Sequence, residues 1–166
     1  MQESRDRAVV GFAEHDHARC VAHALDAADT HCSREGLRFT TVRRRALEIL
    51  LESHTALGAY DVLARLEQDG LGSQPPLAYR ALAFLVDNGF AHRVERLNAF
   101  IACASPGIRH DPAFMICTGC HAVAETPSAP GRTALGRSAR ESGFRIESTV
   151  LEAEGLCAGC QGEEGA

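Results

Sequence analysis

The stretch PPLAYRALAFLVDNGFAHRVERLNAFIAC, residues 75–103, contains a helical pattern followed at once by a strand pattern. Its two opening prolines suit the first turn of a helix, and Gly89 suits the position just after its end. Between them, Ala78, Leu82, Leu85 and Val86 recur on one face at helical spacing, while Arg80 falls on another face. We therefore predict a helix that begins at the prolines and closes at Gly89, with Arg80 exposed.

The residues after this helix predict a β-hairpin. Apolar and polar side chains alternate along residues 90–94, and a second short run covers residues 99–103, with a turn at residues 96–98 between them. Two short strands joined in this way form the wing of a winged helix-turn-helix when they follow a set of packed helices.

Three further helices are predicted upstream. The first carries its apolar face along residues 21–32 and stops near Gly36. The second begins after Thr40 or Thr41, either of which can cap it, and the third covers residues 59–68. Helices followed by a hairpin predict a winged helix-turn-helix, in which the last helix enters the major groove of DNA.

The predicted recognition helix offers Tyr79 and Arg80 for base reading. An arginine can pair with both O6 and N7 of guanine, and a tyrosine can contact a thymine methyl group or a phosphate. Residues 34–45, REGLRFTTVRRR, hold five arginines against one glutamate, a local charge of +4. Three of these arginines are predicted to contact phosphates: Arg43, Arg44 and Arg45. The alternative for each arginine is a solvated position on an exposed face.

Composition limits the remaining possibilities. The 166 residues suffice for one or two small domains, and the net charge of −5 means that a DNA-binding surface must be a local basic patch. No apolar run reaches the roughly 18 residues of a membrane span, and the N-terminus lacks the apolar core of a signal peptide. We expect a cytoplasmic protein without a membrane partner.

The cysteines indicate a metal site. The chain has seven, of which four form two C-x-x-C pairs: Cys117 with Cys120, and Cys157 with Cys160. Two such pairs can complete the tetrahedral coordination of a structural Zn²⁺. The alternatives are redox-active dithiols or a chance spacing, although no βαβ pattern surrounds either pair.

The pairs lie in a second, smaller domain. We place the DNA-binding domain, with an N-terminal extension, at residues 1–104, a breaker-rich linker at 105–112, and the second domain at 113–166. Within the second domain we predict a hairpin across the first C-x-x-C, a helix over about 132–141, and a strand along 144–157 that leads into the second C-x-x-C. The fold class is α+β, with little apolar core in the second domain, as in a domain stapled by zinc.

Four blocks of the chain resemble the ferric uptake regulator family, and in particular its zinc uptake regulator branch. The blocks are AYDVLARL at 59–66, PPLAYRALAFLVDNGFAHRVE at 75–95, FMICTGCHAVAE at 114–125 and VLEAEGLCAGC at 150–160. The resemblance covers roughly residues 18–161 and departs from the family pattern at residues 39–43 (FTTVR), Leu77, Ala78 and His121.

The resemblance implies a homodimeric repressor with an N-terminal winged helix and a C-terminal dimerisation domain of the small α/β type. It implies a second, regulatory zinc ion, and hence two Zn²⁺ per chain. By position, the regulatory ligands implied are two imidazoles, one thiolate and one carboxylate: His92, Cys103, His110 and Glu125. Without the resemblance, the sequence is equally consistent with no metal at these positions, with His92 as a hydrogen-bonded wing residue and Cys103 as a small buried side chain.

The function expected from this resemblance is zinc-responsive repression of zinc-uptake genes through palindromic operator DNA. A thiolate among the regulatory ligands favours zinc over a hard cation. The alternatives are an iron- or peroxide-responsive regulator of the same family and a C-x-x-C thiol redox protein. No nucleophile–base or phosphate-loop motif occurs in the sequence, so we expect neither an enzyme nor a small-molecule substrate.

Overall fold

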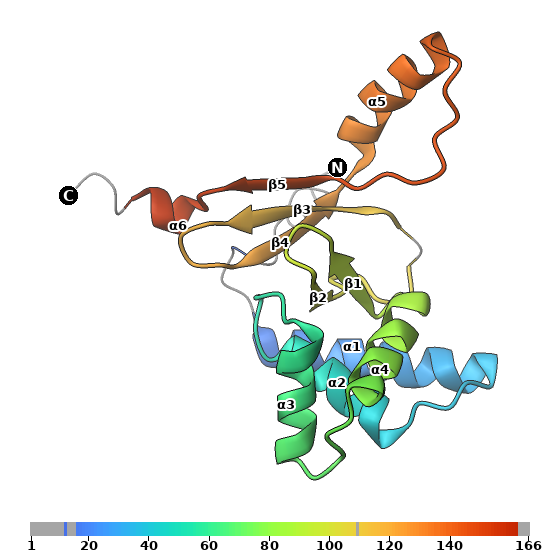
Figure 1. Cartoon of the computed structure of the whole chain (residues 1–166), viewed down its shortest axis with the longest axis vertical. Coiled ribbons are helices and arrows are strands. Elements are labelled where there is room, and N and C mark those ends of the chain that lie inside the picture. The colour runs from blue at the N-terminus through green and yellow to red at the C-terminus, as the bar shows by residue number, and fades with distance from the viewer. Residues whose placement is uncertain (1–11, 13–15, 109, 163–166) are drawn as a thin grey trace. The chain divides into compact units, whose positions relative to one another are not determined.

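The computed structural model describes residues 12, 16–108 and 110–162 (Figure 1). The chain forms two compact units, an N-terminal one of residues 14–109 and a C-terminal one from residue 110 onward. The predicted linker, residues 105–112, spans the division between them. The predicted N-terminal extension lies almost wholly outside the described residues, as do residues 163–166.

The first helix of the N-terminal unit ends, and the second begins, at the positions predicted. Helix α1, His17–Glu35, begins where the Asp16 carboxylate accepts from the Arg19 N–H at 3.1 Å. It ends at Gly36, whose φ of 66° is the left-handed conformation that glycine adopts without strain. Helix α2, Thr41–Leu51, begins after Thr40, whose hydroxyl accepts from the Arg43 N–H.

The next two helices confirm the predicted periodicity. Helix α3, Ala59–Gln68, buries Ala59, Val62, Leu63 and Leu66 on one face. Helix α4, Pro75–Asp87, carries its prolines at the first turn and buries Ala78, Ala81, Leu82 and Leu85. Gly89, with φ of 73°, turns the chain out of α4, and Asp87 is the last helical residue. Figure 1 shows α2, α3 and α4 packed together beneath the hairpin.

The hairpin follows as predicted. Strands β1, Ala91–Val94, and β2, Ala99–Ala102, pair in antiparallel register, with His92 opposite Ile101. An isolated bridge joins Leu57, just before α3, to Phe100 on β2. The hairpin therefore continues the core of the helical unit, in which Phe90 at its base is only 1% exposed.

The C-terminal unit contains one mixed sheet. Strands β3, Pro112–Cys117, and β4, Val123–Pro127, are antiparallel, and β5, Glu152–Gly155, pairs with β3 in parallel, so the strand order is β4-β3-β5. Helix α5, Ala129–Glu141, connects β4 to the returning chain, and the short helix α6, Ala158–Gln161, follows β5.

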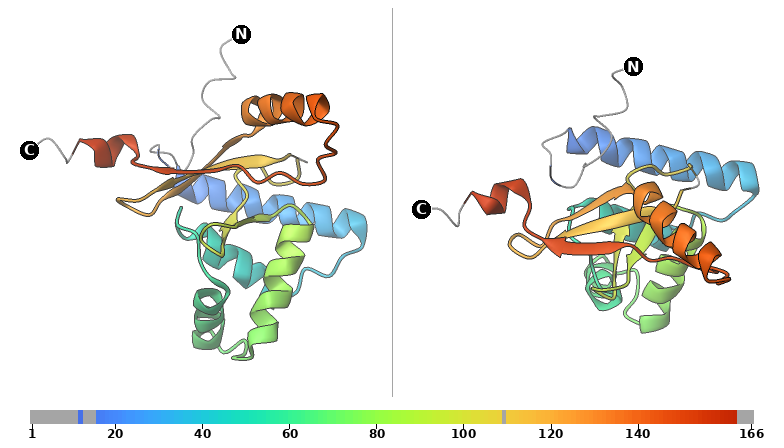
Figure 2. Two further views of the ribbon diagram at one scale, coloured as in Figure 1. Left: turned by 45° about the horizontal axis from the view of Figure 1, so that its top comes forward. Right: turned by 90° about the horizontal axis from the view of Figure 1, so that it is seen from above.

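The long strand predicted over residues 144–157 is wrong for most of its length. Only Glu152–Gly155 is a strand, because β3 offers partners from Phe114 to Cys117 and the pairing ends with them. Figures 1 and 2 show the chain between α5 and β5 as an extended connection. Two apolar residues of this connection are exposed, Phe144 at 67% and Val150 at 60%. Alternation of apolar and polar residues was therefore not sufficient for a strand here.

Few residues form the core of the C-terminal unit, as expected. Besides Cys117, its buried apolar residues on the sheet are Phe114, Ile116, Val123 and Ala124, with Ala139 on α5. A unit with so small a core usually needs a further stabilising element such as a metal ion. Among the described residues, no helix has the length and apolar character needed to cross a membrane.

Candidate metal centres and nucleic-acid interface

The four cysteines of the two C-x-x-C pairs meet at one end of the C-terminal sheet. Cys117 ends β3, Cys120 lies in the turn that follows, Cys157 caps α6 and Cys160 lies within it. All four are free thiols, and their sulfur atoms lie within 4.8 Å of one another. The Sγ atoms of Cys120 and Cys157 are 3.8 Å apart. Tetrahedral Zn²⁺ with Zn–S bonds of about 2.3 Å requires a separation of about 3.8 Å, so the donor set fits this ion.

Backbone contacts already favour a thiolate at this cluster. The backbone N–H of Cys157 donates to Cys117 Sγ at 3.3 Å and lowers the pKa of the Cys117 thiol to about 6. The hydrogen bond between the side chains of Cys160 and Cys157 raises the pKa of Cys160 to about 12. The thiol of Cys120 is subject to opposing effects. A hydrogen bond from the Ala122 backbone lowers its pKa, but the hydrogen bond with the Cys117 side chain and burial raise it, and the net pKa of Cys120 is raised. A bound cation would remove this competition by ionising all four thiols.

Two turn residues fix the shape of the first C-x-x-C. A Cβ atom at Gly119 would lie 2.9 Å from Cys160 Sγ, so this position allows close approach of the two pairs only as glycine. His121, one residue past the pair, has φ of 62°, the left-handed conformation that favours glycine. Its N–H donates to the Cys117 carbonyl at 3.0 Å, which closes the turn. The family departure noted at His121 therefore falls at a strained backbone position.

The second predicted ligand set is divided between the two units. In the N-terminal unit, His92 on β1 and Cys103 just after β2 bring a ring nitrogen and the sulfur within 4.8 Å of each other. The Cys103 N–H donates to the Phe90 carbonyl at 3.0 Å, and the Ser105 N–H donates to Cys103 Sγ at 3.3 Å. These bonds hold the sulfur at the base of the wing beside the imidazole.

The C-terminal unit holds the other two predicted ligands in contact. His110 precedes β3, and its Nε2 lies 2.5 Å from Oε1 of Glu125 on β4. Glu125 is opposite Phe114 in the register of β3 and β4. Each unit therefore provides one pair of adjacent donors. The pair is an imidazole with a thiol in the N-terminal unit and an imidazole with a carboxylate in the C-terminal unit.

The exposed face of α4 carries the predicted base-reading residues. Tyr79 is 49% exposed and Arg80 is exposed, while Ala78 and Ala81 beside them are buried. Tyr60, at the first turn of α3, is 66% exposed and its ring meets that of Tyr79 edge to face, with centroids 6.4 Å apart. The sequence reasoning missed Tyr60; an aromatic residue on the polar side of an amphipathic helix was the signal that could have found it.

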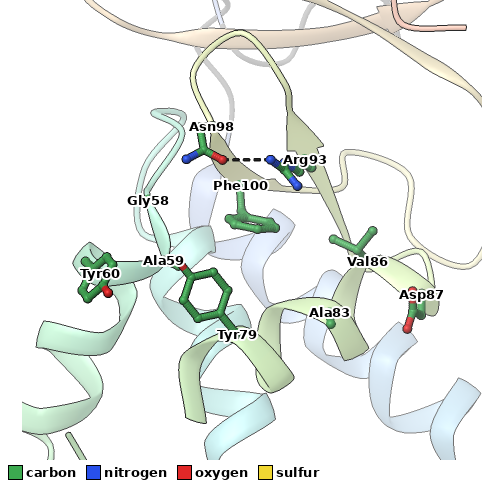
Figure 3. A pocket seen from close by; sticks show the side chains of 10 residues that line it. All are labelled: Gly58, Ala59, Tyr60, Tyr79, Ala83, Val86, Asp87, Arg93, Asn98 and Phe100. Carbon is green, nitrogen blue, oxygen red and sulfur yellow. Dashed lines mark hydrogen bonds between the residues drawn. The ribbon is translucent and has the colours of Figure 1, made fainter. Parts of the chain in front are cut away.

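A cavity of about 490 Å³ lies between the start of α3, α4 and the hairpin (Figure 3). Tyr60, Tyr79 and Phe100 contribute its aromatic surface. Arg93 on β1 lines it as well and donates to the Asn98 side chain at 2.9 Å, the contact dashed in Figure 3. The cavity separates the exposed face of α4 from the wing.

The three predicted phosphate contacts on α2 have different surroundings. The Arg43 guanidinium lies over the Phe84 ring, with its Cζ 3.7 Å from the ring centroid. Arg44 pairs with the Asp29 carboxylate on α1. Arg45 pairs with three carboxylates at 2.6–3.4 Å, and its hydrogen bond to Asp69 raises its pKa. Spacing along the sequence gave no means of distinguishing these three arginines.

Comparison with known proteins agrees with these features. The zinc uptake regulation protein of Escherichia coli (strain K12) is 34% identical over 137 residues, which are 82% of this chain and 80% of that protein. The chain belongs to the zinc uptake regulator branch of the ferric uptake regulator family. The protein of the same name from Shigella flexneri matches to the same extent. No protein-family model matches the chain.

Solved structures of zinc uptake regulators have the same fold. A zinc uptake regulator complexed with zinc and DNA is 33% identical, with a TM-score of 0.81 over 88% of this chain and 98% of that chain. The holo form of XcZur is 35% identical, with a TM-score of 0.73 over 83% of this chain and 96% of that chain. The α+β class with an N-terminal winged helix is thereby confirmed.

Proposed function

We propose that this protein is a zinc-responsive transcriptional repressor that binds palindromic operator DNA as a zinc-loaded homodimer and shuts off zinc-uptake genes in the cytoplasm. The observation that carries this proposal is the match, over most of both chains, to a zinc uptake regulator complexed with zinc and DNA. The exposed Tyr79–Arg80 face of α4 supports the DNA-binding part. We assign no catalytic residue and no small-molecule substrate.

The first zinc ion is proposed to be structural, with Cys117, Cys120, Cys157 and Cys160 as its ligands. The support is the convergence of four sulfurs within 4.8 Å in a unit with a small apolar core. Four thiolates leave no open coordination position, so such a site stabilises the fold and offers no place for an exchanging ligand. The clustering of both pairs also disfavours the redox alternative, which expects one isolated pair.

The second zinc ion is proposed to be regulatory, with His92, Cys103, His110 and Glu125 as its ligands. The support is the adjacency of the two donors within each unit and the chemistry of the set, which suits tetrahedral Zn²⁺. Because each unit contributes two ligands, binding one ion would restrain the units relative to each other. A restrained pair of winged helices in a dimer loses less conformational freedom on binding two half-sites.

Dimer formation is proposed to use the C-terminal unit. Three large apolar side chains of this unit are exposed, which supports burial against a second copy: Leu135, Phe144 and Val150. Two of them, Phe144 and Val150, lie in the connection between α5 and β5.

DNA recognition is proposed to use Tyr79 and Arg80 for bases and the arginines of α2 for phosphates. Tyr60 adds a second exposed tyrosine beside the base-reading face. Among the α2 arginines, Arg43 and Arg44 have fewer carboxylate neighbours than Arg45. For Arg45, a phosphate contact would require exchange of its present ion pairs.

The test combines metal analysis with DNA binding on the wild type, Cys103→Ser and Cys20→Ser. Cys20 is an exposed thiol on α1, so Cys20→Ser makes the same chemical change at a residue that belongs to neither proposed ligand set. We expect two zinc ions per chain in the wild type and in Cys20→Ser, and one in Cys103→Ser, with loss of zinc-dependent operator binding. Unchanged metal content and binding in Cys103→Ser would overturn the regulatory site. A response to ferrous iron in place of zinc would favour the iron-sensing alternative.

A further inference from the structure

The arginines at the start of α2 have unequal freedom to bind an anion. Arg45 lies against Asp69, Glu52 and Glu48 at 2.6, 3.3 and 3.4 Å, so its charge is compensated within the protein. Arg44 pairs with the Asp29 carboxylate. Within the described part of the chain, Arg43 forms no ion pair with a carboxylate. Its positive charge is therefore the one that remains available on this turn of α2.

The Arg43 side chain is nevertheless held in place. Its guanidinium lies over the Phe84 ring at 3.7 Å, and Nη1 donates to the backbone carbonyl of Arg38. The contact brings the central carbon of the guanidinium over the ring. The group has five N–H donors in its plane, of which the Arg38 carbonyl takes one, so in-plane donors remain for a phosphate oxygen.

The Phe84 ring itself packs against the ring of Phe39. Phe39 stacks on it with a centroid separation of 6.4 Å and an interplanar angle of 25°. Phe39 also contacts Phe90, at 6.3 Å, and Phe90 is 1% exposed in the core. The surface that carries Arg43 is therefore a rigid extension of the core of the N-terminal unit.

Phe84 also relates Arg43 to the recognition helix. It lies on α4 four residues after Arg80, so the ring that supports Arg43 and the residue proposed to read bases belong to adjacent turns of one helix. Because the Arg43 guanidinium rests on a side chain of α4, its distance from Arg80 on the same helix is fixed. A phosphate contact fixes the register in which a recognition helix meets the bases.

We propose that Phe84 is a positioning residue for DNA binding, whose ring face holds Arg43 ready to contact a backbone phosphate. This inference rests on the proposed DNA-binding function and assigns the phosphate contact to Arg43 in preference to its two neighbours. A positioned arginine loses less side-chain freedom on binding than a free one, and a cation–π contact at a partly exposed site changes an equilibrium constant about two- to fivefold.

The experiment measures binding of the zinc-loaded full chain to a duplex selected by the protein from random-sequence DNA and to a duplex of unrelated sequence, over a range of salt concentrations. A phosphate contact contributes about 0.9 to the slope of log K against log salt concentration on duplex DNA. We expect Arg43→Gln to lower this slope by about 0.9 on both duplexes, and Arg45→Gln to leave it unchanged.

Phe84→Leu keeps an apolar side chain but removes the ring face, and Phe84→Tyr keeps the face. We expect Phe84→Leu to weaken binding about two- to fivefold, Phe84→Tyr to bind as the wild type does, and Phe84→Leu to add nothing in an Arg43→Gln background. A purely structural role of Phe84 would weaken binding equally in both backgrounds and would overturn the proposal.

Two further outcomes keep the test decisive. If Phe84→Leu does not fold, Arg43→Lys retains the charge and removes the planar stacking, and we expect it to weaken binding to the same extent; binding equal to that of the wild type would overturn the proposal. If the zinc-loaded wild type binds neither duplex, the proposed function fails. If it binds and Arg43→Gln leaves the salt slope unchanged, only this inference fails.

Discussion

Replacing Gly119 with alanine is expected to weaken zinc binding at the four-cysteine cluster. The new Cβ atom would lie 2.9 Å from Cys160 Sγ, 3.1 Å from Cys160 Cβ and 3.3 Å from a methyl carbon of Leu156. Ordinary contacts between such atoms are about 3.5–4.0 Å. Cys160 belongs to α6 and is a proposed ligand, so it cannot move away without displacing its sulfur from the other three.

The size of the effect follows from the overpacking. Forcing an additional methyl group into a packed site costs about 1–3 kcal/mol. Expressed as an equilibrium constant, this cost predicts a zinc dissociation constant about 5- to 150-fold higher than that of the wild type. A chromophoric chelator that competes for the structural zinc would report this change directly.

Gly155→Ala provides the matched control. Gly155 lies in β5 of the same unit, and a Cβ atom there would meet no atom within 4 Å. Both substitutions reduce the freedom of the unfolded chain by a similar amount, so that contribution cancels in the comparison. If Gly119→Ala and Gly155→Ala give up zinc to the chelator equally, the close approach of the two C-x-x-C pairs does not determine zinc affinity and the reasoning is refuted.

Three further predictions concern other positions. His121→Gly is expected to stabilise the zinc-loaded protein by about 0.5–1 kcal/mol, because His121 has φ of 62°; thermal unfolding would measure it, and an unchanged or lower midpoint would count against strain at this turn. Arg80→Ala is expected to weaken operator binding by about 1–3 kcal/mol and binding to unrelated DNA far less; equal losses in a titration would contradict base reading. Zinc affinity of the four-cysteine cluster should fall as pH is lowered, because Cys120 and Cys160 must release protons to bind the ion. The fall should be steeper below about pH 6, where Cys117 also becomes protonated. Competition with a chelator across this pH range measures the zinc affinity, and an affinity that does not change with pH would contradict the prediction.

Much of the fold followed from local patterns in the sequence. The apolar spacing in residues 59–68, the prolines that open α4 and the glycine at position 89 each act within a few residues, and the structure has the corresponding elements. The same holds for the cap of α2, which is Thr40, one of the two threonines that the sequence offered. Such signals are readable because helix faces and caps depend on neighbours three or four positions apart.

The prediction failed where the outcome depended on a distant partner. Residues 144–151 alternate like a strand, but a strand requires a neighbour, and within 144–157 only Glu152–Gly155 pair with β3. Tyr60 was overlooked because its contact with Tyr79 joins two helices that are separate in the sequence. Both cases depend on contacts between residues that are too far apart in the sequence to be recognised from a short segment.

The sequence by itself determined which residues are able to bind metal or DNA. The two C-x-x-C pairs, the imidazole and thiol of the wing and the arginines of α2 are visible as chemistry before any coordinates are considered. Only the tertiary structure decided how that chemistry is distributed. It brings four sulfurs within 4.8 Å of one another. It also neutralises Arg45 with the carboxylates of Glu48, Glu52 and Asp69. It also leaves Arg43 supported on an aromatic ring. The reason is that charge compensation and close approach act through space, over a few ångströms, and so also join residues far apart in the chain, such as Arg45 with Asp69 and Arg43 with Phe84.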